Sequence, residues 1–231
     1  MLTTEDLLLL LTDDVTGKLA ISGSQVDVAL AGANLIELTL MERVDLAAKG
    51  EQTRAGRVVV RDSASTADPL LDSALAELTK RQGKKPSAVI SPLSKGIRRE
   101  LYSRLTARGI LRSEQGKILG IFPTHSWPTR DAEHENTLRH EITNTLVQGT
   151  TPEPRIASLV SLLHALKAVH KVVDPKQHGV RRSDLNARAK EIADGNWGSK
   201  AVRQAVDEMT AAVMIATTAA ISASAASAGS S

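Results

Sequence analysis

The sequence predicts a mainly α-helical protein. Of its 231 residues, 42% are hydrophobic but only 2% are aromatic, so Leu, Val, Ile and Ala must build the core. Side chains of this kind favour helices packed on helices. Long segments also carry apolar residues at helical spacing, whereas the strand patterns are short. The length is enough for one large core or at most two small ones.

The first third of the chain contains three predicted helices. Thr3 or Thr4 can cap the first helix, which has acidic residues in its first turn and five leucines behind them. Glu37 is the charged residue within the second helix, and we expect it to form a salt bridge in the core. The other predicted elements are weak strands over 18–21 and 25–28, a central helix over 29–43, a β-branched strand over 57–62 and a helix that Asp68 caps and Pro69 begins.

A basic amphipathic helix is predicted from Pro92 to Arg108. Ser91 can cap it, proline suits its first position, and Gly109 can adopt the left-handed conformation that ends a helix. Its apolar residues recur at every fourth position and face a core; they are Leu93, Ile97, Leu101 and Leu105.

The charge of this stretch locates the candidate site. Residues 95–117 contain seven basic and two acidic side chains, a net charge of +5, whereas the whole chain carries only +3. Lys95, Arg98 and Arg99 occupy the first two turns, where the helix dipole disfavours each cation by roughly 0.3–1 kcal/mol. A bound phosphate or sulfate would reverse that cost, so we expect these residues to bind an anion. The alternative is a solvated basic face without a ligand.

An apolar hairpin is predicted directly after this helix. Residues 110–122 fit two short strands around a turn at 114–116, and the second strand ends at Pro123. Apolar side chains cover both faces of the second strand, so it either packs in the core or is exposed for membrane insertion or self-association. The residues concerned are Leu119, Ile121 and Phe122.

The remainder of the chain is again helical in prediction. The expected helices cover 131–147, 155–173, a polar segment ending at Asp194, and 201–226, with Trp197 in a loop. The last 23 residues, 209–231, carry no charge, but they are mostly Ala, Ser and Thr, which gain little in lipid. We therefore expect a buried helix with a frayed end, and no membrane span or signal peptide.

Known catalytic and metal-binding motifs are missing from the sequence. Without cysteine there can be no disulfide, thiolate metal site or cysteine nucleophile, which fits a cytosolic protein. The histidine pairs 134/140 and 164/170 are each six residues apart, about 120° around a helix, which does not suit a shared metal. No phosphate-binding loop, dinucleotide motif or nucleophile elbow is present. We predict no catalytic residue, no metal ligand and no cofactor.

Five segments, in order along nearly the whole chain, resemble the Golgi phosphoprotein 3 family, whose members are cytosolic adaptors that bind phosphatidylinositol 4-phosphate, and its bacterial relatives. The segments are LTTEDLLLLLTDDVTGKL, ALAGANLIELTL, RVVVRDSASTADPLLDSALAEL, SPLSKGIRRELYSRLTARGIL and RIASLVSLLHALKAVHKVV. The resemblance implies a single helical domain over residues 1–226, with a disordered tail over 227–231. Its expected architecture is a central helix bundle ringed by amphipathic helices, with short β-hairpins, one of which protrudes.

The resemblance also implies a lipid site. The family holds the lipid phosphate with two basic residues on the helix before the hairpin, together with a Trp and an Arg. The two basic positions fall on Lys95 and Arg98. Ala31 stands at the position of the Arg, and the Trp position falls near Ser22. The family hairpin serves membrane insertion or self-association, which here would involve the three apolar residues named above.

The leading hypothesis is therefore a non-enzymatic, cytoplasmic, peripheral membrane protein that binds anionic phospholipid headgroups, with the hairpin inserted in the membrane or packed against a second copy. A winged-helix DNA-binding protein is the first alternative, with Arg99, Arg104 and Arg108 on DNA phosphates. Nucleic acid is the poorer match because the supposed wing is apolar. A helical protein-interaction scaffold without lipid binding is the second alternative.

Overall fold

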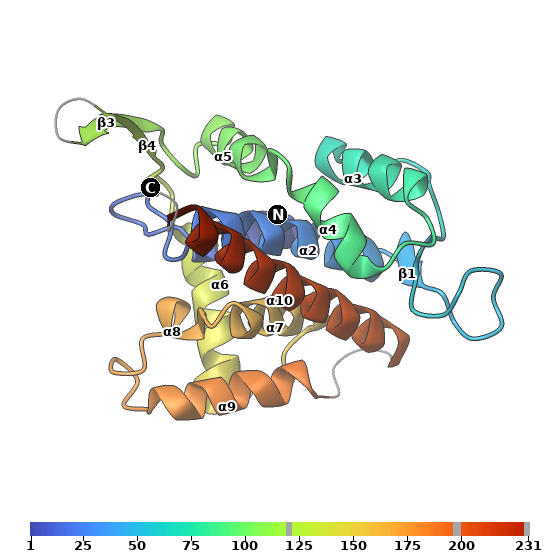
Figure 1. Cartoon of the computed structure of the whole chain (residues 1–231). Helices are drawn as coiled ribbons and strands as arrows, with labels where there is room; N and C mark the ends of the chain where they lie inside the picture. The colour runs from blue at the N-terminus through green and yellow to red at the C-terminus, as the bar shows by residue number, and fades with distance from the viewer. Residues whose placement is uncertain (119–121, 196–199, 229–231) are drawn as a thin grey trace.

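Helix α2 (Gly23–Leu40) lies at the centre of the molecule (Figure 1). The computed structural model describes residues 1–118, 122–195 and 200–228. Nearly all side chains of α2 from Val26 to Thr39 are buried, because α1, α3, α4, α5, α7 and α10 pack around it. The buried apolar residues form one continuous cluster. The predicted mainly helical fold with small hairpins is confirmed.

The other helices surround α2 in chain order. They are α1 (Thr3–Leu10), α3 (Pro69–Lys80), α4 (Pro86–Ser94), α5 (Ile97–Ala107), α6 (Glu133–Thr143), the π-helix η1 (Asn144–Gln148), α7 (Pro154–Ala165), α8 (Val169–Val172), α9 (Arg182–Ala193) and α10 (Lys200–Ala228). None of the helices, as far as the structure describes them, is long and apolar enough to cross a bilayer.

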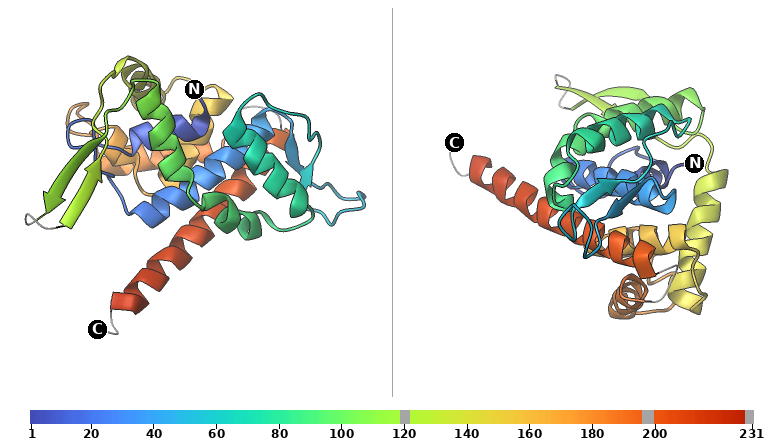
Figure 2. Two further views of the ribbon diagram at one scale, coloured as in Figure 1. Left: turned by 90° about the horizontal axis from the view of Figure 1, so that it is seen from above. Right: turned by 90° about the vertical axis from the view of Figure 1, so that its right-hand side faces the viewer.

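Two antiparallel hairpins complete the fold. Strand β1 (Val44–Leu46) pairs with β2 (Val58–Val60), and β3 (Glu114–Ile118) pairs with β4 (Phe122–Ser126). Figure 2 shows that the β3–β4 hairpin and the C-terminal end of α10 both project from the helical body. The hairpin leaves the body directly after α5, as the sequence predicts.

The start of the chain differs from its prediction in two places. Residues 25–28, predicted as a strand, belong to α2, because Ser22 caps this helix and its hydroxyl accepts from the Gln25 N–H at 3.4 Å. Leu2, not Thr3 or Thr4, occupies the cap position of α1. Thr3 instead donates its backbone N–H to Glu37 Oε2 at 2.9 Å.

The basic helix is two helices rather than one. Lys95 is extended, with a ψ of 113°, and Gly96 is left-handed, with a φ of 74°, so the chain turns between α4 and α5. Pro92, predicted as the first helical residue, lies inside α4. The prediction of a left-handed stop at Gly109, with a φ of 73°, is confirmed.

Two further elements were misplaced by the sequence. The hairpin turn does not lie at 114–116, because these residues belong to β3 and pair with β4, and Pro123 lies within β4 opposite Lys117. The helix predicted over 155–173 breaks after α7, where Lys167 adopts a positive φ of 55°. Helix α10 continues to Ala228. Trp197 and residues 229–231 of the predicted tail lie outside the described residues.

Two buried carboxylates connect α1 to the rest of the bundle. Glu5 and Asp6 are each 1% exposed. Asp6 lies 2.6 Å from Arg155 Nη2 on α7 and 2.8 Å from His134 Nε2 on α6. Glu5 is 3.1 Å from Arg108 Nη1 on α5. Glu37 also pairs with the Arg155 side chain at 4.0 Å, which confirms its predicted salt bridge.

Removal of the Arg155 guanidinium should destabilise the fold. In Arg155→Met, Asp6 keeps only His134 as an ionic partner among the contacts described above, and an uncompensated buried carboxylate is costly. We expect the free energy of unfolding in urea to fall by about 2–3 kcal/mol. Arg181→Met, which removes an exposed pair with Asp184, is the control and should cost less than about 0.5 kcal/mol. Equal losses in the two variants would contradict a structural role for the Asp6–Arg155 pair.

Candidate functional site

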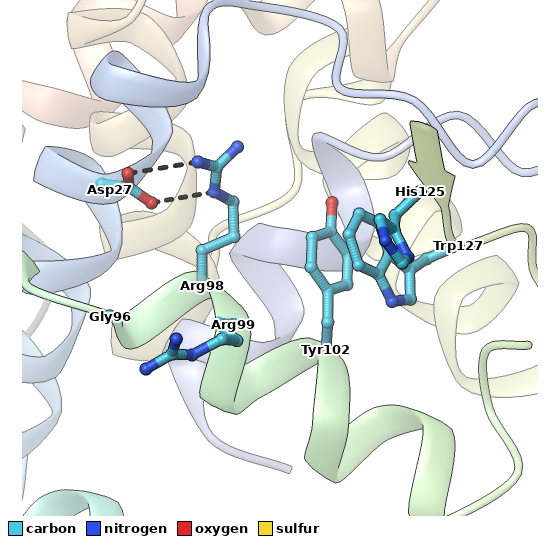
Figure 3. A pocket seen from close by; sticks show the side chains of 7 residues that line it. All are labelled: Asp27, Gly96, Arg98, Arg99, Tyr102, His125 and Trp127. Carbon is cyan, nitrogen blue, oxygen red and sulfur yellow. Dashed lines mark hydrogen bonds and ion pairs between the residues drawn. The ribbon is translucent and has the colours of Figure 1, made fainter. Parts of the chain in front are cut away.

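A cavity of about 730 Å³ opens between the first turns of α5, the first half of α2 and the end of β4 (Figure 3). Its walls combine two guanidinium groups, one carboxylate and three aromatic rings. The lining residues are Asp27, Gly96, Arg98, Arg99, Tyr102, His125 and Trp127.

Arg98 extends from the first turn of α5 to the first turns of α2. Its Nε lies 3.0 Å from Asp27 Oδ1, and its Nη2 donates to Asp27 Oδ2 at 3.3 Å. Gly23 makes this approach possible, because a Cβ at that position would lie 2.5 Å from Arg98 Nη1. The guanidinium is thus held between the backbone of α2 and the open space of the cavity.

Arg99 supplies an unneutralised charge. It is exposed and forms no ion pair with any residue that the structure describes. Gly96, the N-cap of α5, has no side chain to cap the free N–H groups of the first turn. Arg98 and Arg99 therefore bring positive charge to a helix end that already favours an anion.

The third predicted anion ligand, Lys95, lies elsewhere. Because the chain turns at Gly96, the Lys95 side chain lines a separate cavity between α3, α4 and α5, together with Glu77 and Glu100. The structure thus brings Arg98 and Arg99 together and does not bring Lys95 into their cavity.

The remaining arginines of the basic stretch have structural partners. Arg104 pairs with Asp68 at 2.6 Å and with Glu5 at 3.3 Å, and its hydrogen bonds lower the pKa of Asp68. Arg108 also pairs with Glu5. Arg112 pairs with Glu114 at 3.1 Å. Much of the net charge seen in the sequence is thus neutralised locally, and the free positive charge is concentrated at the start of α5.

An aromatic stack forms the wall opposite Arg98. The rings of Tyr102 and Trp127 are parallel within 2°, with their centroids 4.0 Å apart. The Tyr102 hydroxyl is 3.1 Å from Thr12 Oγ1, and burial raises the pKa of Tyr102. The sequence analysis missed Trp127, His125 and Asp27 as cavity residues. Only the position of the His-Ser-Trp-Pro segment directly after the hairpin signalled that an aromatic group lies near α5.

The loop after α1 holds Trp127 in place. The Trp127 N–H donates to the Gly17 carbonyl at 3.0 Å, and the Thr129 N–H donates to the Asp14 carbonyl at 2.9 Å. Gly17 is left-handed, with a φ of 63°, and a Cβ there would lie 2.2 Å from the Trp127 nitrogen. Only glycine fits this contact, so the loop and the Trp127 segment are bound closely together.

A family model described as Golgi phosphoprotein 3 (GPP34) matches residues 4–209, which include every residue of the cavity. The chain belongs to the Golgi phosphoprotein 3 family. A search of curated proteins finds no match. Membership in the Golgi phosphoprotein 3 family indicates a lipid-binding adaptor of the kind that recognises phosphatidylinositol 4-phosphate.

The family positions are only partly present in this cavity. Arg98 lines it, whereas Ser22 caps α2 and Ala31 is completely buried. Of the predicted hairpin residues, Leu119 and Ile121 lie outside the described residues, and the backbone of Phe122 pairs with Ile118. Within the described part of the chain, no group of three or more His, Asp and Glu residues could hold a metal ion.

A titratable carboxyl lies beneath the loop that supports Trp127. Glu135 on α6 is 2% exposed, and its Oε1 accepts from Arg139 Nε at 2.9 Å. Burial raises the pKa of Glu135 to about 7; Arg139 opposes this rise, and the Asp14 carboxylate adds to it. The proton on Glu135 therefore relieves repulsion between two neighbouring carboxyl groups.

The stability of the protein should depend on this proton. Because the folded-state pKa of Glu135 lies above its ordinary value of 4.5, its stabilising contribution is present below about pH 4.5 and is lost as the pH rises to about 7. We expect Glu135→Gln to raise the free energy of unfolding by about 1–3 kcal/mol at pH 8 and to change it little at pH 4.5. Chemical denaturation of both proteins at the two pH values measures this. An equal effect at both pH values would contradict the raised pKa.

Proposed function

We propose that this chain is a peripheral membrane protein that binds a phosphorylated phospholipid headgroup in the cavity beside α5. Phosphatidylinositol 4-phosphate is the ligand that family membership favours. Arg98 and Arg99 bind the phosphate, and no reaction is catalysed. Lys95 adds to the positive potential of this face from outside the cavity, since it is exposed directly before Gly96.

The combination of two arginines with an aromatic stack in one cavity carries this proposal. Guanidinium groups bind phosphate oxygens through paired N–H donors, and each cation near an anionic surface contributes about 1 kcal/mol. Tryptophan is favoured at the level of lipid headgroups because one end of its ring system is polar. In this reading Trp127 supplies, from β4, the aromatic group that other members carry near the position of Ser22.

The hairpin provides a second contact. It projects from the body beside the cavity (Figures 1 and 2). We propose that Leu119, Ile121 and Phe122 enter the membrane interface or pack against a second copy of the chain. A shallow apolar insertion next to a cationic cavity gives reversible, salt-sensitive attachment to a cytoplasmic membrane surface.

DNA binding has less support. Two of the three arginines that a winged helix would place on DNA phosphates, Arg104 and Arg108, form ion pairs with Asp68 and Glu5. Their release would expose buried carboxylate, so they are poor phosphate ligands.

Neutralising the cavity arginines should abolish lipid binding. The double variant Arg98→Gln, Arg99→Gln loses both phosphate ligands, and we expect its sedimentation with vesicles containing phosphatidylinositol 4-phosphate to fall at least about tenfold. Arg181→Gln, Arg182→Gln is the matched control. It removes two adjacent arginines from α9, on the opposite side of the molecule from α5 (Figures 1 and 2), and should bind like the wild type. Equal losses in both would indicate a general charge effect, and no loss in either would place the lipid elsewhere.

The aromatic stack should also matter for vesicle binding. We expect Trp127→Ala to weaken binding about fivefold to tenfold, because it removes the cavity wall and the ring at headgroup depth. Trp127→Phe keeps a ring against Tyr102 and should recover part of the loss. Circular dichroism confirms that each variant is folded. Full binding by the alanine variant would remove Trp127 from the proposed site.

A further inference from the structure

Asp27 places a negative charge in a cavity that is otherwise suited to an anion. Its carboxylate and the Arg98 guanidinium are about equally accessible, with side-chain exposures of 30% and 34%. The ion pair is imperfect: Asp27 Oδ1 is inaccessible to solvent and has no hydrogen-bond partner, although Arg98 Nε lies 3.0 Å away. Figure 3 shows the carboxylate facing the guanidinium edge that carries Nε and Nη2.

The charge of the cavity follows from its lining. The ionisable groups that face it are Asp27, Arg98, Arg99, Tyr102 and His125. With Asp27 ionised, the two arginines and the carboxylate give a net charge of +1 in place of +2. Burial raises the pKa of Asp27, and Arg98 opposes the rise, so the ionised carboxylate is held at a cost that the arginine offsets.

We infer that Asp27 is an internal competitor for the anionic ligand, which occupies Arg98 in the free protein and sets the affinity of the cavity. The inference rests on the proposed function, because it concerns the same cavity. A phosphate that binds Arg98 must displace this carboxylate or lie close to it. Arg99, which has no such counter-ion among the described residues, is then the first contact, and Arg98 is the contact that Asp27 controls.

Two consequences distinguish competition from a structural role. First, removal of the Asp27 charge should favour a ligand in proportion to the ligand's own charge, since the repulsion is coulombic. A phosphomonoester carries between one and two negative charges near neutral pH, whereas a phosphodiester carries one. Second, ligand binding should be linked to proton uptake, because protonated Asp27 no longer competes.

The decisive variant is Asp27→Asn, which keeps the shape of the side chain and removes its charge. We expect the association constant for phosphatidylcholine vesicles containing phosphatidylserine to rise about fivefold. With phosphatidic acid or phosphatidylinositol 4-phosphate in place of phosphatidylserine, the rise should be larger, up to about 25-fold. Asp184→Asn is the matched control, because Asp184 forms an exposed pair with Arg181 on α9, and it should change neither value. Thermal unfolding confirms that both variants are folded.

Sulfate, a dianion that does not titrate in this range, tests proton linkage in solution by calorimetry. In the wild type its affinity should rise as the pH falls from about 7 to about 5, in part because Asp27 becomes protonated. His125 adds to this rise when it is protonated, so the comparison is made in a His125→Gln background. There, Asp27→Asn should remove the remaining pH dependence.

The outcomes separate this inference from the proposed function. Unchanged or weaker binding by Asp27→Asn, or equal gains for both lipid classes, overturns competition and leaves Asp27 as a support for Arg98. A charge-dependent gain with sulfate but no vesicle binding by any variant upholds the competitor and overturns the lipid function. Binding that survives Arg98→Gln, Arg99→Gln but does not respond to Asp27 overturns both. If neither the wild type nor Asp27→Asn binds any vesicle or sulfate, both are also overturned.

Discussion

The structure depends on two carboxylates that solvent does not reach. Glu5 and Asp6 follow each other in the first turn of α1, so their side chains leave the helix in different directions: Glu5 meets α5, and Asp6 meets α6 and α7. A buried charge is tolerated only with partners in good geometry, and here the partners come from three helices distant in sequence. The pairing fixes where α5 lies relative to α1. It thereby fixes the first turn of α5, from which the candidate site is built.

The cavity is a product of that placement. Three segments meet there: the start of α5 with its two arginines, the first turns of α2 with Gly23 and Asp27, and the end of β4 with Trp127. None of them resembles a binding motif alone. The arginines at the end of α5 serve packing, because acidic residues neutralise them, whereas those at its start remain available to the cavity. One amphipathic helix therefore carries structural charge at one end and functional charge at the other.

Local signals in the sequence were sufficient for elements that local interactions determine. Asp68 caps α3 and Gly109 ends α5 because a side-chain hydrogen bond and a left-handed residue act within a few positions. The turn at Gly96 could not be recognised, since glycine is also tolerated within a helix, and this moved Lys95 away from the cavity. The strand register was lost for a similar reason, because the apolar pattern does not show which residues of a hairpin form its turn. Arg98 and Arg99 were predicted from charge, but the stacking of Trp127 on Tyr102 is a tertiary contact between residues 25 positions apart and left no periodic trace.

The stack of Trp127 on Tyr102 also has a mechanical meaning. It joins the hairpin to α5, and the hydrogen bond from Trp127 to Gly17 joins the same point to the loop after α1. A force that moves the hairpin is therefore transmitted to one wall of the cavity, while Arg98 and Asp27 form the other wall. Since thermodynamic coupling is reciprocal, engagement of the hairpin tip and occupation of the cavity would each bias the other. The aromatic pair is thus a hinge pin between an anchoring element and a recognition element.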